Sequence, residues 1–426
     1  MKNTTKTLTG LLSTALASTS ALATNGDNLI GIGPISRAMG GTGIAAPQDA
    51  ISAVFANPAA MCFTPGCAYS EVNFGGTLFM PQTSGSVSLM TPDGPYEASA
   101  DSKKNVYAIP AIGLSVPIDP ETRRWRFGLA AYGVSGLGVD YRNTSLDQPQ
   151  FFDMGPQGQF PLIQGEFTSL MIMKFAPSVS YQILPNLSVG LAGHIDYATL
   201  DLRNGSSPAY GFGAQVGVVW QPIDHLSLGA TYVTEQRTEF DSVINYFGAS
   251  RDLALASPQT VGLGAAYGFM QDRLLLAVEG KWLNWGDATG YDDFDWEDQW
   301  VANVGVQFAA IEKKLFLRAG YGYGSNPVKE NNGWSPDPTD GQGRTVQGMY
   351  FPDYYYETFR VIGFPAIAEH HVTAGIGYAF SEKFEANLGY MHAFENTLSE
   401  TSAGDFAEIS STLSEDSVEL GFTWRF

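Results

Sequence analysis

Apolar and polar residues alternate along most of this chain. The alternation is regular from Leu274 to Trp285, from Leu315 to Tyr323, from Phe384 to Tyr390 and from Val418 to Phe426. A period of two residues is that of a β-strand with one apolar and one polar face. The sequence therefore predicts an all-β protein.

The polar faces of these strands are rich in glycine and charge, and aromatic residues gather at the strand ends. This arrangement is typical of a membrane barrel, whose apolar face meets lipid and whose lumen is polar. A closed bacterial barrel has an even number of strands. About fourteen candidate strands can be placed, at 68–80, 105–117, 124–137, 166–183, 186–202, 210–221, 225–236, 257–269, 273–286, 299–310, 313–324, 370–380, 383–395 and 413–426.

The connections between these strands alternate in length, which supports the count. Short ones lie at 184–186, 222–224, 270–272 and 381–382, and longer ones at 81–104, 138–165, 237–256 and 325–369. Short turns at one end and long loops at the other mark the periplasmic and extracellular ends of a barrel. Residues 67–426 are therefore predicted to form a transmembrane antiparallel β-barrel. Its terminal Phe426 is similar to the signal read by the barrel assembly machinery, the expected partner during biogenesis.

The segment before the first strand has two parts. Residues 1–23 carry Lys2 and Lys6, a weakly apolar run, and a final Ala21-Leu22-Ala23, which predicts a secretory signal peptide cleaved before Thr24. Residues 24–66 show no alternation and are too apolar for a free tail. We expect them to form a compact plug inside the lumen; the alternative is a periplasmic linker.

Composition excludes some functions. A net charge of −20 and a pI near 4.5 leave no basic surface for nucleic acid. Charged residues are only 15% of the chain, against about 25% in soluble proteins. A surface covered by outer-membrane lipid and lipopolysaccharide would account for this.

Several ordered motifs resemble one family. They are Gly40-Gly41-Thr42-Gly43 within the Gly-rich run from Thr24, then Asn57-Pro58-Ala59, Phe175-Ala-Pro-Ser, Ser257-Pro-Gln-Thr, Trp282-Leu-Asn-Trp285, Leu317-Arg-Ala-Gly-Tyr321 with Asn326-Pro327, and His370-His-Val-Thr. The set is similar to the outer-membrane long-chain fatty acid and aromatic hydrocarbon transporters (FadL/TodX-like). The resemblance implies a monomer in the outer membrane of a Gram-negative bacterium. It also implies passive uptake of hydrophobic small molecules, released sideways under control of the plug, called the hatch.

Two groups of candidate site residues follow. For gating by the hatch we single out Gly40, Gly41, Asn57, Pro58 and Ala59, because Pro58 fixes a bend and Asn57 can bond backbone groups that would otherwise be unsatisfied. Alternation also places three cations in the lumen, which either meet a ligand head group or pair with an acid such as Glu279, Glu385 or Glu419. These cations are Lys281, Arg318 and Arg425.

The connection 203–209 is short, whereas family members that carry fatty acids often have a long insertion there. Ligand capture is therefore expected on the loops 138–165 or 325–369, whose aromatic residues have an interfacial girdle as their alternative role. The candidates for capture are Phe151, Phe152, Phe160, Tyr354 and Tyr355.

The remaining chemistry is sparse. Cys62 and Cys67 are the only cysteines, and either form a disulfide or remain two inert thiols. No catalytic motif, cofactor motif or metal motif is recognisable, so we expect no enzyme activity, no cofactor and no metal. The alternative functions are an adhesin or a barrel enzyme of the same architecture and, less well supported, an open porin.

Overall fold

The computed structural model describes residues 24–63, 69–103, 106–119, 121–153, 158–246 and 249–426. Fourteen antiparallel strands form one closed barrel, as predicted, because the last strand pairs with the first along its whole length. In order around the wall they are β3 (Glu71–Thr91), β5 (Tyr107–Pro117), β6 (Trp125–Leu137), β9 (Ser169–Leu184), β10 (Leu187–Asp201), β11 (Ser207–Ile223), β12 (Leu226–Val233), β15 (Thr260–Phe269), β16 (Leu274–Leu283), β17 (Gln299–Ile311), β18 (Leu315–Gly324), β21 (His370–Ser381), β22 (Phe384–Thr401) and β23 (Ala407–Arg425).

The two faces of the wall have the predicted character. Large apolar side chains such as Phe212 (68% exposed), Leu263 (61%) and Trp300 (65%) point outward. Buried positions of the same strands carry polar side chains, among them Asn73, Gln215 and Asn387. A closed ladder satisfies every strand internally, so this outer face can meet lipid.

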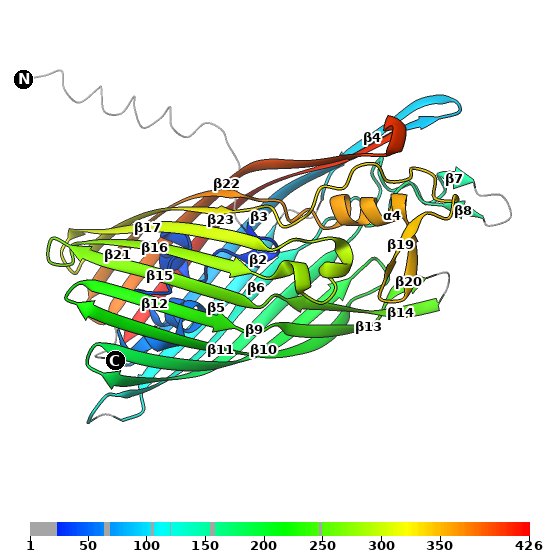
Figure 1. The fold of residues 1–426 in the computed structure, drawn as a ribbon. Helices are drawn as coiled ribbons and strands as arrows, with labels where there is room; N and C mark the ends of the chain where they lie inside the picture. The colour runs from blue at the N-terminus through cyan, green and yellow to red at the C-terminus, as the bar shows by residue number, and fades with distance from the viewer. Residues whose placement is uncertain (1–23, 64–68, 104–105, 120, 154–157, 247–248) are drawn as a thin grey trace, which may run out of the picture.

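Tight turns close one end of the barrel, and the longer connections gather at the other (Figure 1). Parts of these connections are strands, although the sequence predicted loops. β3 continues to Thr91 and turns into β4 (Gly94–Asp101), and 237–256 lies within a hairpin of β13 (Gln236–Tyr246) and β14 (Ala249–Ser257). Strands that extend beyond the lipid need no continuous apolar face, so the membrane pattern stops before the strands do.

Short elements complete the outer end. They are β7 (Phe152–Asp153), β8 (Gln159–Phe160), η3 (Trp285–Asp287), η4 (Asp292–Phe294), β19 (Gly343–Val346), β20 (Met349–Pro352), α4 (Asp353–Thr358), η5 (Phe359–Gly363) and η6 (Ala403–Asp405). No helix among the described residues is long and apolar enough to cross a membrane.

The N-terminal segment lies within the barrel, where Figure 1 shows it in blue. Nearly all of residues 24–63 are buried. Its elements are β1 (Thr24–Asn25), β2 (Asn28–Leu29), α2 (Pro34–Ala38), α3 (Ala50–Ala56) and η1 (Pro58–Cys62). The predicted signal peptide 1–23, the predicted boundary at residue 66 and Cys67 fall outside the described residues. We call residues 24–63 the hatch.

Candidate functional site

Asn57 joins the hatch to the barrel wall. It caps η1 by accepting a hydrogen bond from Ala59 N at 3.1 Å. Its amide nitrogen donates to Ile44 O within the hatch at 2.9 Å and to Val218 O of β11 at 3.0 Å. The side chain is fully buried, so these partners replace water. Pro58 stands at the first position of η1, where its missing N–H costs nothing.

Glycines on the inner wall let the hatch backbone come close. A Cβ on Gly190 of β10 would lie 2.2 Å from Ala59 N, and one on Gly217 of β11 would lie 1.9 Å from Asn57 Oδ1. Neither distance is compatible with a side chain. Glycine at these inner positions therefore allows the hatch to contact the wall.

Gly40 and Gly41 form the turn after α2. Both have positive φ, +68° and +84°, which favours glycine. Gly40 N donates to Thr373 Oγ1 at 2.9 Å, and a Cβ on Gly40 would lie 2.8 Å from Val304 O. The turn is thus held against the opposite side of the wall from Asn57.

Buried charges hold the hatch as well. Arg37 of α2 pairs with Glu419 of β23 at 3.1 Å, and Glu279 of β16 accepts from Gly43 N at 2.6 Å. Burial raises the pKa of Asp27 to about 6, although the Tyr291 hydroxyl donates to it. Burial also raises the pKa of Asp49 to about 6, against the hydrogen bond from Ser52.

The three predicted lumenal cations all have acidic neighbours. Arg318 lies 3.6 Å from Glu385, and Arg425 lies 2.9 Å from Glu71 and 3.4 Å from Glu385. Lys281 lies 3.9 Å from Glu279, and its ammonium also donates to Gly41 O at 3.4 Å. Of the three, only Lys281 lines the cavity described next.

A cavity of about 120 Å³ lies between the hatch and the wall. Hatch residues Leu29, Ile30 and Phe55 form an apolar side, continued by Val134 of β6 and Leu283 of β16. An apolar cavity of roughly 150 Å³ holds one benzene molecule. The cavity therefore matches a single ring in size.

Polar side chains line the cavity as well, and we call this group its polar end. The group consists of Lys174 of β9, His194 of β10, Gln215 of β11 and Gln236 of β13. These residues were not among those predicted from the sequence. The sequence did contain a signal for them. One histidine, one lysine and two glutamines occupy positions in alternating segments that face the lumen, where an apolar plug was predicted.

The barrel wall changes beside this cavity. The ladder between β5 and β6 ends at the pair Ala111 and Tyr132, and β6 is irregular between Gly133 and Ser135, where Ser135 pairs with Asn28 of the hatch. Side chains fill the interval, since a Cβ on Gly133 would lie 2.5 Å from Ile109 Cγ2. We call this interval, 107–110 against 133–137, the wall seam.

The aromatic residues predicted for capture form one cluster at the outer end. Phe152 lies 4.9 Å from Phe151 and 5.5 Å from Tyr354, and Phe160 stacks on Tyr355 at 6.4 Å. Tyr354 and Tyr355 are buried, and their hydroxyls donate to Leu162 O and Pro161 O. In this conformation the two tyrosines pack the loops together.

A second cavity, of about 300 Å³, lies among the outer loops. Its aromatic lining is Phe167, Phe294, Phe351 and Phe359, with Arg203 beside them. This cavity was not predicted from the sequence, because its walls come from five separate connections.

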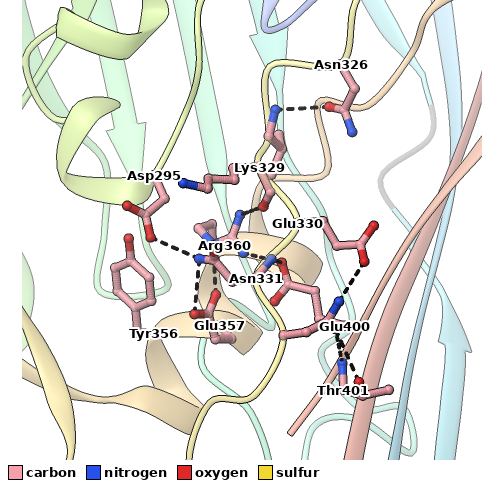
Figure 2. Close-up of polar contacts among 12 residues, drawn as sticks. Asp295, Asn326, Lys329, Glu330, Asn331, Tyr356, Glu357, Arg360, Glu400 and Thr401 are labelled. Atoms are coloured by element: carbon pink, nitrogen blue, oxygen red, sulfur yellow. Dashed lines mark hydrogen bonds and ion pairs between the residues drawn. The ribbon is translucent and has the colours of Figure 1, made fainter.

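An ion network fixes the loop 325–369 over the barrel (Figure 2). Arg360 pairs with Glu357 at 2.8 Å and with Glu400 of β22, and donates to Lys329 O. Asn331 adds hydrogen bonds to Glu400 and Asp295. Burial raises the pKa of Glu357, and the Arg360 guanidinium opposes that shift. Removing one member of such a buried network costs about 3–5 kcal/mol.

Cys62 is buried at the end of η1, with its sulfur 3.3 Å from Ser180 Oγ. Because Cys67 lies outside the described residues, the disulfide stays a prediction.

These features define an outer-membrane type of β-barrel with a hatch of its own chain in the lumen. Residues 10–207 match the family model described as outer membrane protein transport protein (OMPP1/FadL/TodX). This part of the chain is therefore similar to that family. No curated protein matches it.

Three solved structures show the same fold. The toluene transporter TodX of Pseudomonas putida is 20% identical, with a TM-score of 0.64 over 93% of this chain and 99% of its own. The toluene transporter TbuX of Ralstonia pickettii is 16% identical, with a TM-score of 0.63 over 94% and 99%. A FadL homologue of Pseudomonas aeruginosa is 15% identical, with a TM-score of 0.61 over 96% and 100%.

Proposed function

We propose that this protein is a passive outer-membrane transporter of hydrophobic small molecules. The observation that carries the proposal is the cavity between Phe55 of the hatch and Val134 of the wall. Apolar surface costs about 25 cal/mol per Å² in water. A cavity with apolar walls removes much of this cost at the point where the lumen is blocked, and needs no energy source.

The outer loops supply the entry and the wall seam supplies the exit. An apolar compound first meets the aromatic side chains around the 300 Å³ outer cavity. From the inner cavity it leaves between β5 and β6, where Tyr132 and Val134 line the cavity and the backbone ladder has ended. Sideways release into lipid keeps the compound out of water along the whole path. The hatch, held by Asn57, controls access to that exit.

The experiment is uptake of a radiolabelled hydrophobic compound by cells that lack their own transporters of this type. Ala56→Trp fills the cavity from the hatch side, since Ala56 lines it. Ala302→Trp makes the same change on the exposed face of β17 and is the matched control. We expect uptake to fall at least tenfold with Ala56→Trp and to stay near wild type with Ala302→Trp. Equal uptake by the two variants, at equal amounts of folded barrel, would exclude the cavity from transport.

The exit has its own pair of variants. Ile109→Trp enlarges a side chain in the wall seam, whereas Ile112→Trp enlarges one that is 41% exposed where β5 is fully paired. Slower uptake with Ile109→Trp alone supports sideways release. Slower uptake with both, or with neither, contradicts it.

A further inference from the structure

The polar end of the inner cavity contains buried groups without hydrogen bonds. Neither ring nitrogen of His194 makes a well-aligned hydrogen bond to a described residue, although the residue is only 4% exposed and the side chains of Gln215 and Gln236 lie within reach of it. Gln215 Oε1 and Asn25 Oδ1 are also buried without a partner among the described residues. Burying a polar group without a partner costs about 1–3 kcal/mol. A cavity for a pure hydrocarbon would gain nothing from these groups.

The surrounding side chains leave these groups free for a ligand. The amide nitrogen of Gln215 is already used by Phe55 O, Ala56 O and Thr231 Oγ1, at 3.0 to 3.1 Å. Its oxygen remains as an acceptor. A neutral imidazole offers one donor and one acceptor, so it can bond a hydroxyl group in either direction. A ligand that can donate a hydrogen bond would satisfy these free acceptors.

The charges at the cavity are already balanced. Lys174 lies 3.1 Å from Asp196, and Lys281 lies 3.9 Å from Glu279, so each lysine that lines the cavity has its own carboxylate. A carboxylate on the ligand would enter without a counter-ion of its own, and a buried charge without a partner is strongly disfavoured. The polar end is therefore suited to a neutral group.

We infer that the inner cavity selects neutral single-ring compounds that carry a hydroxyl group, with His194 as a residue that determines this specificity. The inference rests on the proposed function and names the ligand class of the same site. The apolar side of the cavity receives the ring, and the hydroxyl group bonds His194 and the Gln215 oxygen. The size of about 120 Å³ fits one ring and excludes a long chain lying wholly within it.

The test is calorimetric binding by the purified full-length protein in detergent, in a sealed cell at pH 7. The probes share one ring and one methyl group: toluene, p-cresol with a neutral hydroxyl, and p-toluate with a carboxylate. Laurate is the fourth probe. We expect p-cresol to bind at least about tenfold more tightly than toluene, because toluene leaves the buried polar groups unpaired, and more tightly than p-toluate.

Two variants locate the effect. His194→Leu removes both ring nitrogens, whereas His392→Leu makes the same change at a half-buried histidine of β22 that does not line the cavity. The preference for p-cresol over toluene should fall below about threefold in His194→Leu and persist in His392→Leu. Gln215 is left unchanged because its amide holds the hatch.

The order of affinities in the wild-type protein decides the inference even if His194→Leu does not fold. Toluene binding as tightly as p-cresol would show that water satisfies the polar end, and p-toluate binding most tightly would show a charged site; either result overturns the inference. Binding of laurate alone would overturn it and leave the proposed function standing. Binding of none of the four would count against both.

Discussion

At the scale of single residues, contact between hatch and wall depends on positions that have no side chain. Gly190 of β10 lies against the backbone of Pro58 and Ala59, and Gly217 of β11 lies against the Asn57 side chain. The sequence shows glycine on the polar faces of the strands but not which glycines meet the hatch. That assignment depends on how residues more than a hundred positions apart come together.

Gly190→Ala should loosen the hatch without opening the barrel. The new methyl group would lie 2.2 Å from Ala59 N and 2.4 Å from Pro58 C, so η1 must move and Asn57 loses its alignment with Ile44 O and Val218 O. Amide hydrogen exchange in residues 44–62 should become at least tenfold faster. Gly193→Ala on the same strand is the control, because its methyl group meets no atom within 4 Å. Equal protection of the hatch amides from exchange in the two variants would mean that the close contact between Gly190 and Ala59 does not hold the hatch.

At the scale of elements, the fourteen wall strands were predictable and the cavity was not. Each wall strand has one face towards lipid and the other towards the lumen. The alternation within a single segment, such as 274–283, is therefore enough to locate the strand. The cavity combines hatch residues with His194 and Gln215, from strands far away in sequence. The outer hairpins were missed for a related reason, since β13 has no lipid-facing pattern.

The docking of the hatch should strengthen as pH falls from 7.5 to 5. Burial raises the pKa of Asp27 and of Asp49 to about 6, above the usual value of 3.8. A carboxyl group whose pKa is raised in the docked state contributes stability that is complete below its undocked pKa and is lost as pH rises through about 6. The charge of Glu71 raises the pKa of Asp49 and the charge of Arg318 lowers it, and the Tyr291 hydroxyl donates a hydrogen bond to Asp27.

Hydrogen exchange of the hatch, corrected for the intrinsic effect of pH, measures this dependence. The double variant Asp27→Asn/Asp49→Asn should reduce it, because neither amide titrates. Asn also retains the cap that Asp49 gives to Ser52 N at 2.8 Å. A hatch that is protected equally at pH 5 and pH 7.5 in the wild-type protein would contradict the prediction.

At the scale of the whole molecule, the barrel closes without help from the hatch. β23 pairs with β3 from Ala407 and Leu89 to Arg425 and Glu71, whereas the ladder pair between the described hatch and the wall is Asn28 with Ser135. Outside the wall seam, the backbone of the wall is therefore satisfied by the wall itself. Hatch contacts are made mainly by side chains and by single hydrogen bonds, which can change while the barrel persists.

Asn57→Ala/Pro58→Ala should therefore separate transport from assembly. The wild-type protein should migrate faster on gels when unboiled, because a closed ladder resists detergent, and the double variant should show the same shift and yield. Its uptake of a hydrophobic probe should fall at least fivefold, since Asn57 holds the carbonyl of Ile44, a cavity residue. Leakage of a small polar solute should rise as the hatch loosens.

Leu420→Arg is the opposite control. It places a charge on the outward face of β23, where Leu420 is 49% exposed, and a charge on the lipid face destabilises a barrel by about 2–4 kcal/mol. This variant should therefore weaken the gel shift itself. Unchanged uptake by a correctly assembled Asn57→Ala/Pro58→Ala variant would remove this hatch contact from the mechanism and leave the wall seam and the outer loops to control passage.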